Sequence, residues 1–353
     1  MMLNFYILGG FMLIINKSKP FYLNKMQKKL RMGNFTFTGK ELYYDSEDLL
    51  LIFDNIKTPI SRKKLVELIS HSSNSTVEEI EMAIDYLIQE NFIINYEEYN
   101  NLINDNKYNR QNLFFTLFNK EYNNYSKCFL GKNILILGLG GIGANTCMML
   151  YKAGFNRFTL VDCDKVEESN LIRQFPYDVN DIGKDKTECL KEKLLDVDIK
   201  IKNIKINNYS DISDEIKNAD FVLCTIDKPL RVIRRLINKI CVDYKKPVLF
   251  CGFSEHVGMI GPFVVPNESA CLKCIEKNVK EVPLNNVDLV PSYGPLCFMI
   301  SSIVCNEIIN FYVKFNDFNL IGKTLMFDFA TYKSKLVKWK RKNNCEVCKH
   351  ASN

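Results

Sequence analysis

Four of the thirteen cysteines stand in two pairs that have the spacing of zinc ligands. Cys271 and Cys274 form one Cys-x-x-Cys pair, and Cys345 and Cys348 form a second pair about 70 residues later. Four thiolates complete a tetrahedral zinc site with no position open to a substrate, so such a site is structural. The spacing predicts a clasp that ties the C-terminal tail to a distant loop. Unrelated buried cysteines and a redox pair are the alternatives.

A glycine-rich loop is the second feature with a defined chemistry. The apolar run 134–137, typical of a strand buried on both faces, leads into Gly138-Leu139-Gly140-Gly141-Ile142-Gly143. In such a loop the first glycine permits a tight turn, the second lets the backbone approach a phosphate, and the last lets a helix pack on the strand. Asp162 ends the next apolar strand, where a carboxylate can hold ribose hydroxyls. The loop alone indicates only a nucleotide, with a dehydrogenase as the default interpretation.

The segment that follows argues against a dehydrogenase. After Asp162-Cys163-Asp164 come four polar side chains within one short stretch, namely Asn170, Arg173, Gln174 and Lys186. A guanidinium and an ammonium group near a phosphate loop suit a triphosphate whose charge is neutralised during attack, and a hydride transfer needs no such groups. Each cation taken singly could equally be a surface residue paired with Asp178 or Asp181.

Asp227 is a candidate metal ligand. It follows the apolar strand 221–224, at the carboxyl end of the strand, where α/β sheets bind ligands. A carboxylate that faces phosphates at this place is a natural Mg²⁺ ligand. The alternative is that Asp227 caps the helix that begins near Pro229.

Such residues meet only if a sheet brings successive strand ends together. Apolar strands alternate with helical patterns through the second half of the chain. The strands are expected at 134–137, 158–161, 201–206, 221–224 and 248–251, and the helices at 144–153, 186–195 and 230–244. This alternation predicts a doubly wound, mostly parallel Rossmann-like α/β domain over residues 108–353.

Residues 1–96 predict a different module. Strand-like runs such as 35–38 precede helical patterns at 62–70 and 77–90, and a short apolar strand follows at 92–94. This order describes a small winged-helix-like α+β domain. Residues 97–107 are rich in Asn and Glu and have no apolar period, so they are expected to form a linker.

The composition sets further bounds. Apolar residues make up 47% and charged residues 25%, which excludes a disordered chain. The net charge of +6 is too small to indicate a nucleic-acid partner. Many unpaired thiols indicate a reducing cytosol. The apolar stretch 5–15 is too short to span a bilayer, so we expect a buried strand pair there, with a membrane or targeting role as the alternative.

Together these motifs resemble the ubiquitin-activating-enzyme-like adenylyltransferases, the superfamily of ThiF and MoeB. The match begins at Tyr108-Asn109-Arg110-Gln111 and runs to the second cysteine pair. The resemblance implies that ATP, with Mg²⁺, adenylylates the C-terminal carboxylate of a small protein or peptide. It implies that the nucleotide is held by Gly138, Gly140, Gly141, Gly143, Asp162, Asp164, Asn170, Arg173, Gln174 and Lys186, and Mg²⁺ by Asp227.

The resemblance also assigns a role to Arg110. It matches an arginine that these enzymes insert into the ATP site of the neighbouring subunit, which implies a homodimer. Without the resemblance, Arg110 is only a basic residue in a polar segment. The catalytic set implied by the resemblance is therefore Arg110, Arg173, Lys186 and Asp227.

Within the superfamily the chain most resembles the MccB-like enzymes, which attach a nucleotide to a ribosomal peptide in antibiotic biosynthesis. This resemblance rests on an N-terminal module before residue 108 and on the segments 89–94, 261–266 and 293–296. The resemblance implies that the module grips a peptide and that the product is a phosphoramidate. The alternatives are a sulfur-carrier adenylyltransferase that acts on a Gly-Gly C-terminus, and a non-catalytic peptide-binding partner in a peptide-modifying complex.

Cysteine placement argues against a thioester intermediate. Members of the superfamily that form one usually carry a cysteine in the crossover segment after the first Cys-x-x-Cys pair. The crossover segment is expected at 275–292, and residues 275–296 contain no cysteine. Cys297 begins an apolar helix expected at 298–311, which is typical of a core thiol. Cys251, near a strand end, is the remaining nucleophile candidate.

Overall fold

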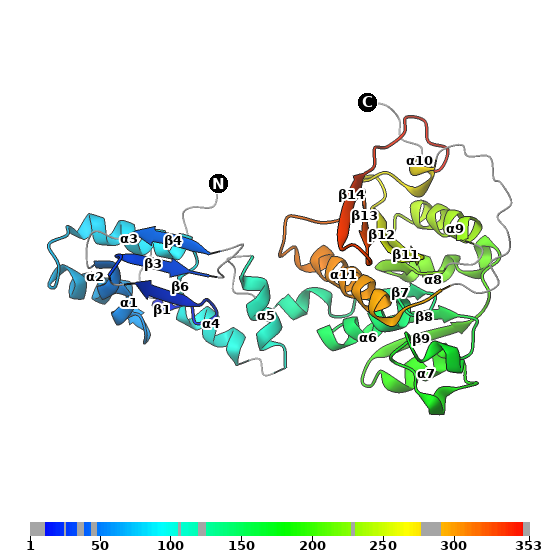
Figure 1. Cartoon of the computed structure of the whole chain (residues 1–353), viewed down its shortest axis with the longest axis horizontal. Coiled ribbons are helices and arrows are strands. Elements are labelled where there is room, and N and C mark those ends of the chain that lie inside the picture. Colours follow the sequence, from blue (N-terminus) through cyan, green and yellow to red (C-terminus); the bar gives the residue numbers. More distant parts are fainter. Residues whose placement is uncertain are drawn as a thin grey trace. The chain divides into compact units, whose positions relative to one another are not determined.

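The chain folds into two compact units, Met1–Asn124 and Tyr125–Asn353, in the computed structural model shown in Figure 1. The structure describes residues 11–24, 26–33, 39–43, 48–104, 107–118, 125–226, 230–276 and 291–348. The expected strand at 35–38, most of the expected crossover segment and Asp227 lie outside these ranges.

In the N-terminal unit, two small antiparallel sheets share an apolar core with the first three helices. In the first sheet β1 (Met12–Ile15) lies between β5 (Ile60–Ser61) and β6 (Ile93–Asn95). The second sheet is a meander of β2 (Phe21–Asn24), β3 (Lys29–Met32) and β4 (Lys40–Tyr43). The helices are α1 (Asp48–Asn55), α2 (Arg62–Ser70) and α3 (Val77–Gln89), and they share an apolar core with the strands.

The expected helix over 77–90 is confirmed together with its start signal. Thr76 and Glu79 form a reciprocal capping box: the Glu79 carboxylate accepts from the Thr76 N–H at 2.8 Å, and the Thr76 hydroxyl accepts from the Glu79 N–H at 3.3 Å. Such a cap satisfies N–H groups that a helix leaves unpaired in its first turn. The helix at 62–70 also begins and ends where the sequence predicts.

A helix, α4 (Tyr96–Ile103), replaces most of the expected linker. The Asn95 side chain caps it by accepting the N–H groups of Glu97 and Glu98. Tyr99 and Leu102 are buried, in one cluster with apolar residues of β1 and β6. Tyr96 and Ile103 pack against the same cluster, so the apolar residues of α4 recur at helical spacing, a short pattern that the surrounding Asn and Glu residues obscure. Helix α5 (Asn109–Thr116) follows it within the N-terminal unit.

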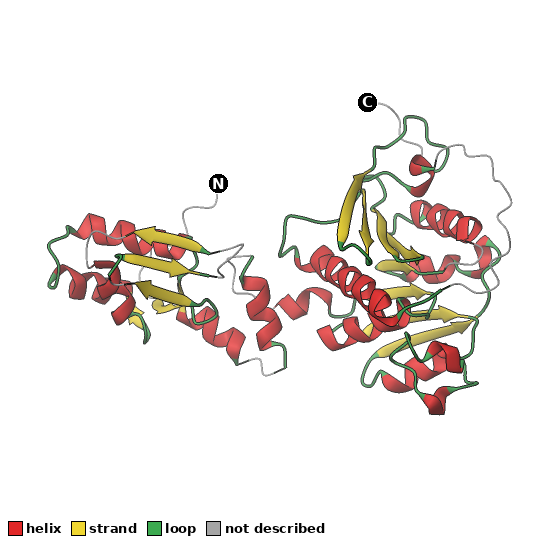
Figure 2. Ribbon diagram, viewed as in Figure 1, coloured by secondary structure: helices red, strands yellow, loops and turns green. Residues whose placement is uncertain are grey.

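The C-terminal unit is built on an eight-stranded sheet, shown in yellow on the right of Figure 2. Five neighbouring strands run parallel, which confirms the doubly wound, mostly parallel α/β fold. In spatial order they are β11 (Val248–Ser254), β10 (Phe221–Cys224), β7 (Asn133–Leu137), β8 (Arg157–Asp162) and β9 (Asp198–Asn203). The helices are α6 (Gly143–Ala153), α7 (Lys186–Lys193), α8 (Ser213–Asn218), α9 (Leu230–Asp243), α10 (Leu272–Ile275) and α11 (Gly294–Val313).

Three antiparallel strands extend this sheet beyond β11. They are β12 (Val257–Val264), β13 (Lys323–Asp328) and β14 (Lys333–Lys338), with β14 at the sheet edge. None was expected from the sequence; half of the residues of β14 are lysines, and β12 contains Pro262. The expected strand at 201–206 also lies three residues too late, since β9 pairs with β8 from Asp198 onward.

The core is layered on both faces of the sheet. All residues of β7 and β10 are buried, as their continuous apolar runs predict. Helix α11 is long and apolar enough to span a bilayer, but 56% of its apolar window is buried inside the fold, where it packs on α6 and β12. This burial is what a core helix requires.

Candidate functional site

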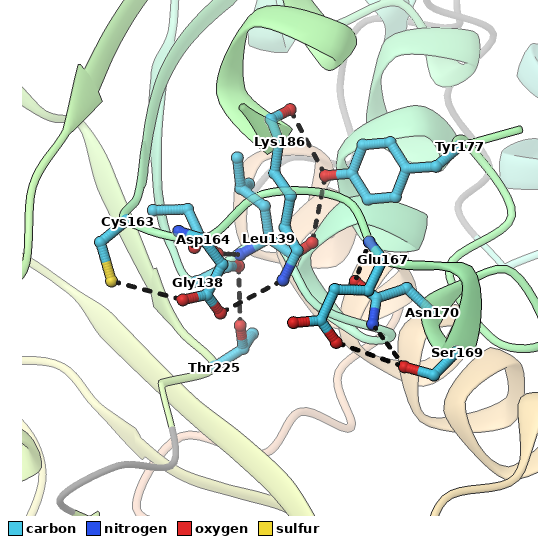
Figure 3. A network of polar contacts seen from close by, with 11 residues as sticks. Gly138, Leu139, Cys163, Asp164, Glu167, Ser169, Asn170, Tyr177, Lys186 and Thr225 are labelled. Carbon is cyan, nitrogen blue, oxygen red and sulfur yellow. Dashed lines mark hydrogen bonds and ion pairs between the residues drawn. The ribbon is translucent and has the colours of Figure 1, made fainter. Parts of the chain in front are cut away.

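The glycine loop is held at the carboxyl ends of three adjacent strands. Gly138 has a φ of +92°, and its N–H donates to the carbonyl of Val161 at 2.9 Å. The Thr225 hydroxyl, just after β10, donates to the carbonyl of Gly138 at 2.8 Å (Figure 3). At Gly143 an added Cβ would lie 1.9 Å from the carbonyl oxygen of Gly138. The loop therefore closes on itself, and two of its glycines are required by backbone geometry.

Two alanine substitutions should separate folding from nucleotide binding in this loop. Gly143→Ala forces backbone atoms apart, so we expect a thermal midpoint several degrees lower and ATP affinity reduced more than tenfold. At Gly140 an added Cβ meets nothing within 4 Å. Gly140→Ala should therefore leave the thermal midpoint unchanged and weaken ATP binding alone, because the methyl group keeps the phosphate away from the backbone. Equal thermal midpoints for the two variants, measured by calorimetry, would contradict this.

Asp162 lies directly against the glycine loop. Its carboxylate accepts the N–H of Leu139 at 2.5 Å and the N–H of Asp164 at 2.8 Å. Burial raises the pKa of Asp162, and the nearby Lys186 and the two N–H donors oppose this. An ionised carboxylate has about four acceptor positions, so it can also receive ribose hydroxyls.

Lys186 is the most enclosed cation of the site. It is only 5% exposed, and its Nζ meets the Asp164 carboxylate at 3.3 Å (Figure 3). The buried Tyr177 hydroxyl donates to the carbonyl of Leu139 at 3.1 Å and lies 3.5 Å from the carbonyl of Lys186. Lys186 is thus joined to the glycine loop, while Asp178 and Asp181 pair with Lys193. The surface ion pairs considered as alternatives do not involve Lys186.

The polar segment 170–174 stands beside this cluster. Arg173 donates from Nη1 to the carbonyl of Ser169 at 2.6 Å, which folds its side chain back over its own turn. The Asn170 side chain is buried and accepts the N–H of Glu167, so it also stabilises the turn. Gln174 is buried, and its Oε1 has no hydrogen-bond partner among the described residues. Of these three side chains, Gln174 is therefore the one whose acceptor oxygen is still available to a ligand.

Asn145 joins the two loops and was missed by the sequence analysis. From α6 its Nδ2 donates to the carbonyls of Gly141 at 2.6 Å and Arg173 at 3.0 Å, and its Oδ1 accepts the N–H of Phe175. Thr225 and Tyr177 were missed as well. Thr225 carries a usable signal, because it directly follows a buried strand next to the glycine-loop strand. For Asn145 and Tyr177 a single sequence contains no such signal.

The structure tests neither of the two remaining site residues expected from the sequence. Arg110 is exposed in the first turn of α5, in the N-terminal unit. Asp227 lies outside the described residues, so its expected role as a Mg²⁺ ligand stays a prediction.

The four cysteines of the expected zinc site come together. Their sulfur atoms all lie within 4.8 Å of one another, and the closest pairs are 3.5 to 3.8 Å apart. Zn–S bonds of about 2.3 Å place tetrahedral sulfurs about 3.8 Å apart, so the cluster fits zinc. Burial opposes ionisation of Cys345, but the N–H groups of Cys348 and Val347 outweigh it and lower the pKa of that thiol to about 7.

The other thiols near the site are poor nucleophiles. Burial raises the pKa of Cys251 to about 12 and that of Cys297 to about 11. Cys163 is exposed beside Asp162, and burial with the neighbouring carboxylates raises its pKa as well. Since the thiolate is the reactive form, none of these groups is poised for thioester chemistry.

Comparison with known proteins identifies relatives over most of the chain. The sequence pattern of the ThiF family matches residues 108–347. The molybdopterin-synthase adenylyltransferase of Escherichia coli K12 is 28% identical over 218 residues, which are 61% of this chain and 86% of that protein. The ThiS adenylyltransferase of the same organism is 26% identical over 222 residues, 62% of this chain and 86% of that protein.

Solved structures extend the likeness to the N-terminal unit. A crystal structure of E. coli MccB with MccA-N7isoASN superposes with a TM-score of 0.81 at 22% identity, over 96% of this chain and 100% of that one. The structure of E. coli MccB with ATP gives 0.79 at 22% identity, with the same coverage. PaaA gives 0.70 at 18% identity, over 92% of this chain and 99% of that one. These matches show a shared fold that includes the N-terminal unit.

Proposed function

The chain belongs to the ThiF family, and from this we propose that it is an ATP-dependent adenylyltransferase that activates the C-terminal carboxylate of a short ribosomal peptide. The observation that carries the proposal is the joined cluster of the glycine loop, Asp162 and Lys186 at the carboxyl edge of the sheet. Relatives of known function are named adenylyltransferases.

The peptide is proposed as acceptor because of the N-terminal unit. The two bacterial relatives of known function align with about three fifths of the chain, whereas the MccB fold accounts for 96% of it. Solved MccB structures carry MccA, and one contains an N-formylated form of it. We propose that residues 1–96 hold a comparable acceptor and that activation first gives an acyl-adenylate on it. A C-terminal asparagine of the acceptor would then cyclise with release of AMP, and its nitrogen would attack the α-phosphorus of a second ATP with release of pyrophosphate, which leaves a phosphoramidate.

The chemistry needs charge neutralisation more than proton transfer. A carboxylate is already nucleophilic at neutral pH, so its oxygen attacks the α-phosphorus of ATP without a general base. The bond from that phosphorus to the bridging oxygen breaks, and pyrophosphate leaves with the electron pair. Lys186 and Arg173 are proposed to stabilise the negative charge that builds on the phosphate oxygens. Because Lys186 now contacts Asp164, it must exchange that partner for phosphate.

Mg²⁺ is proposed to assist at Asp227. Carboxylate oxygens next to phosphates are its preferred protein ligands. Asp227→Ala should abolish activation while the oligomeric state is retained, and full activity in that variant would exclude this residue as the ligand.

A mass-spectrometric assay tests the proposed acceptor. Incubation with ATP and synthetic peptides that carry a free C-terminus should yield a peptide with the mass of one added nucleotide. The sulfur-carrier alternative is supported by the relatives that are named molybdopterin-synthase adenylyltransferase and sulfur carrier protein ThiS adenylyltransferase. It requires an acyl-adenylate only on a small protein that ends in Gly-Gly. Absence of turnover with either acceptor would favour a non-catalytic peptide-binding partner.

Arg110 is proposed to act in the partner subunit of a homodimer. Neither Arg110→Ala nor Lys186→Ala should be active alone. In an equal mixture, half of the dimers pair the two variants, and each such dimer contains one site with both residues intact. Activity should therefore return to about a quarter of the wild-type level. Activity that stays at the level of the separate variants after subunit exchange would show that Arg110 does not act across the dimer.

A further inference from the structure

A polar cavity of about 350 Å³ lies at the β9 end of the central sheet, the end opposite to β14. Two strand residues of β7 and β8, two of β9 and two of α8 contribute to its lining, namely Asn133, Thr159, Lys200, Lys202, Asp214 and Glu215. Small-molecule sites usually have volumes of about 300–1,000 Å³. None of the described lining residues belongs to the glycine loop or to segment 162–186, so the cavity is separate from the nucleotide site.

The two most buried lining residues are polar where the core is otherwise apolar. Thr159 pairs in register with Leu135 on one side and with Lys200 on the other, so all three point to the same face of the sheet. Leu135 belongs to the apolar core on that face. Thr159 is buried and donates its hydroxyl to Oδ1 of the buried Asn133 at 3.1 Å. Burial of polar groups is costly, so such exceptions at core positions are expected at functional sites.

The lining also contains a carboxylate oxygen without a partner. Lys202 meets Oε1 of Glu215 at 2.8 Å and donates to the carbonyl of Asp211 at 2.7 Å. Oε2 of Glu215 is buried and accepts no hydrogen bond from any residue that the structure describes. A buried acceptor without a donor is unfavourable, so this oxygen favours a ligand that carries N–H groups.

Lys200 provides a cation in the same cavity. It is exposed, and it makes no ion pair with a residue in the described part of the chain. Lys200 and Lys202 are two residues apart on β9, so their side chains leave the same face of the strand about 7 Å apart. Because Lys202 already holds Glu215, the cavity offers one unpaired ammonium group and one unpaired carboxylate oxygen. A ligand of one charge sign can pair only one of these groups, whereas a zwitterion pairs both.

We propose that this cavity binds a free amino acid, with its ammonium group on Glu215 and Thr159 and its carboxylate on Lys200. The hydroxyl oxygen of Thr159 has acceptor positions for this purpose. Two lysines and two acids in the lining cancel in charge, which suits a molecule without net charge. A phosphate group would meet Asp214 and Glu215, and a polyamine would meet Lys200 and Lys202. The inference goes beyond the proposed function, because no step of that function uses this cavity.

Asn203 connects the cavity to the nucleotide site. It follows Lys202 in β9, its Nδ2 donates to the Asp185 carboxylate at 3.2 Å, and its Oδ1 accepts from the Thr187 hydroxyl. Asp185 and Thr187 are the chain neighbours of Lys186. An ammonium group that competes with Lys202 for its carboxylate partner acts next to this network, so occupancy of the cavity is expected to change ATP affinity. This coupling rests on the proposed function, in which Lys186 contacts ATP.

Calorimetric titration in the absence of ATP tests the site. Each of the common amino acids is titrated into the full-length protein, and at least one should bind with a dissociation constant below about 1 mM. The α-methyl ester of that amino acid lacks the carboxylate and its N-acetyl derivative lacks the ammonium group, so each should bind more than tenfold more weakly. Absence of binding by every amino acid would overturn the proposal, and so would tighter binding of cadaverine or glutarate than of any amino acid.

Two conservative variants locate the ligand in the cavity. Lys200→Gln should weaken binding of the amino acid more than tenfold and leave the affinity of its methyl ester unchanged, because the ester has no carboxylate for Lys200. Glu215→Gln should likewise weaken the amino acid and spare the N-acetyl derivative. Lys217→Gln is the matched control and should bind as the wild type does, since Lys217 is exposed on the same helix but does not line the cavity. Wild-type affinity in both Lys200→Gln and Glu215→Gln would overturn the site.

ATP titrations with and without the amino acid test the coupling. The bound amino acid should change the dissociation constant of ATP at least about fivefold, and ATP should change that of the amino acid by the same factor. Asn203→Ala should remove this coupling while the amino acid still binds. Equal ATP affinity with and without the amino acid would overturn the coupling. A protein that binds the amino acid but never ATP would contradict the proposed function and leave the cavity site intact.

Discussion

Replacing Lys186 with alanine is expected to lower ATP–pyrophosphate exchange by about 10²- to 10³-fold, the usual cost of removing one donor to developing negative charge. The effect is large because Lys186 is 5% exposed and lies within the contacts that hold the glycine loop. Charge–charge attraction is strongest where water is excluded. The thermal midpoint should change little, since the lost ion pair has Asp164 as its partner, which is 65% exposed.

Lys184→Ala is the matched control. Lys184 lies two residues before Lys186 and is exposed. Its hydrogen bonds in the fold are made by its backbone, which alanine retains. This variant should keep wild-type exchange. An equal loss of exchange in both variants would mean that the general positive charge of the segment matters, and that the buried position of Lys186 does not.

The same substitution should change the pH dependence of nucleotide binding. Burial raises the pKa of Asp162, and Lys186 partly counteracts this. Without Lys186 the pKa of Asp162 rises further, so the carboxylate becomes protonated at a higher pH. ATP affinity of the variant should therefore be lost at a higher pH than that of the wild type as the solution is acidified. Titration of ATP binding between pH 4 and 8 measures this difference.

Cys345→Ser should remove the metal and lower the free energy of unfolding by about 4 kcal/mol, in the range that marks loss of a structural metal. The four sulfurs already have the spacing of a tetrahedral zinc site. Three of the four cysteines are buried in one apolar cluster with α9. We expect about one zinc per wild-type chain by elemental analysis, and none in the variant.

Cys128→Ser provides the control for a lost thiol, because Cys128 is exposed and remote in sequence from both pairs. It should keep its zinc and its stability. A wild-type protein that contains no zinc and unfolds at the same temperature with and without a chelator would show that the cluster is only a group of packed thiols.

The sequence predicted best where one kind of pattern ran uninterrupted. The parallel strands other than β9, and helix α2, appear where their apolar residues indicate them, and the two cysteine pairs meet as their spacing requires. The prediction of a linker at 97–107 was wrong, because Tyr96, Tyr99, Leu102 and Ile103 pack on one apolar cluster and hold helix α4 in an otherwise polar segment. Strand β14 was not predicted because it is stabilised by pairing with β13, and five of its six residues are exposed.

The same contrast between residues in clear sequence patterns and residues placed by tertiary contacts holds for the site. The glycine loop, Asp162 and Lys186 lie together in the structure, as their residue types and their order along the chain predicted. The contacts that position them come from Asn145, Tyr177 and Thr225, which act through backbone carbonyls. A contact to a carbonyl sets no requirement on the sequence of its partner, so the sequence gives no sign of Asn145 or Tyr177, and only the position of Thr225 directly after a buried strand indicates it.

The joining of the cysteine pairs also bears on how this enzyme type could diversify. With zinc bound, the roughly 70 residues between Cys274 and Cys345 become a closed ring whose ends are fixed to the body of the domain. Doubling the length of a flexible loop costs only about 0.6 kcal/mol in closure entropy. Insertions or deletions in the connections of this ring, outside α11, β13 and β14, can therefore accumulate at low thermodynamic cost while the nucleotide loops stay in place.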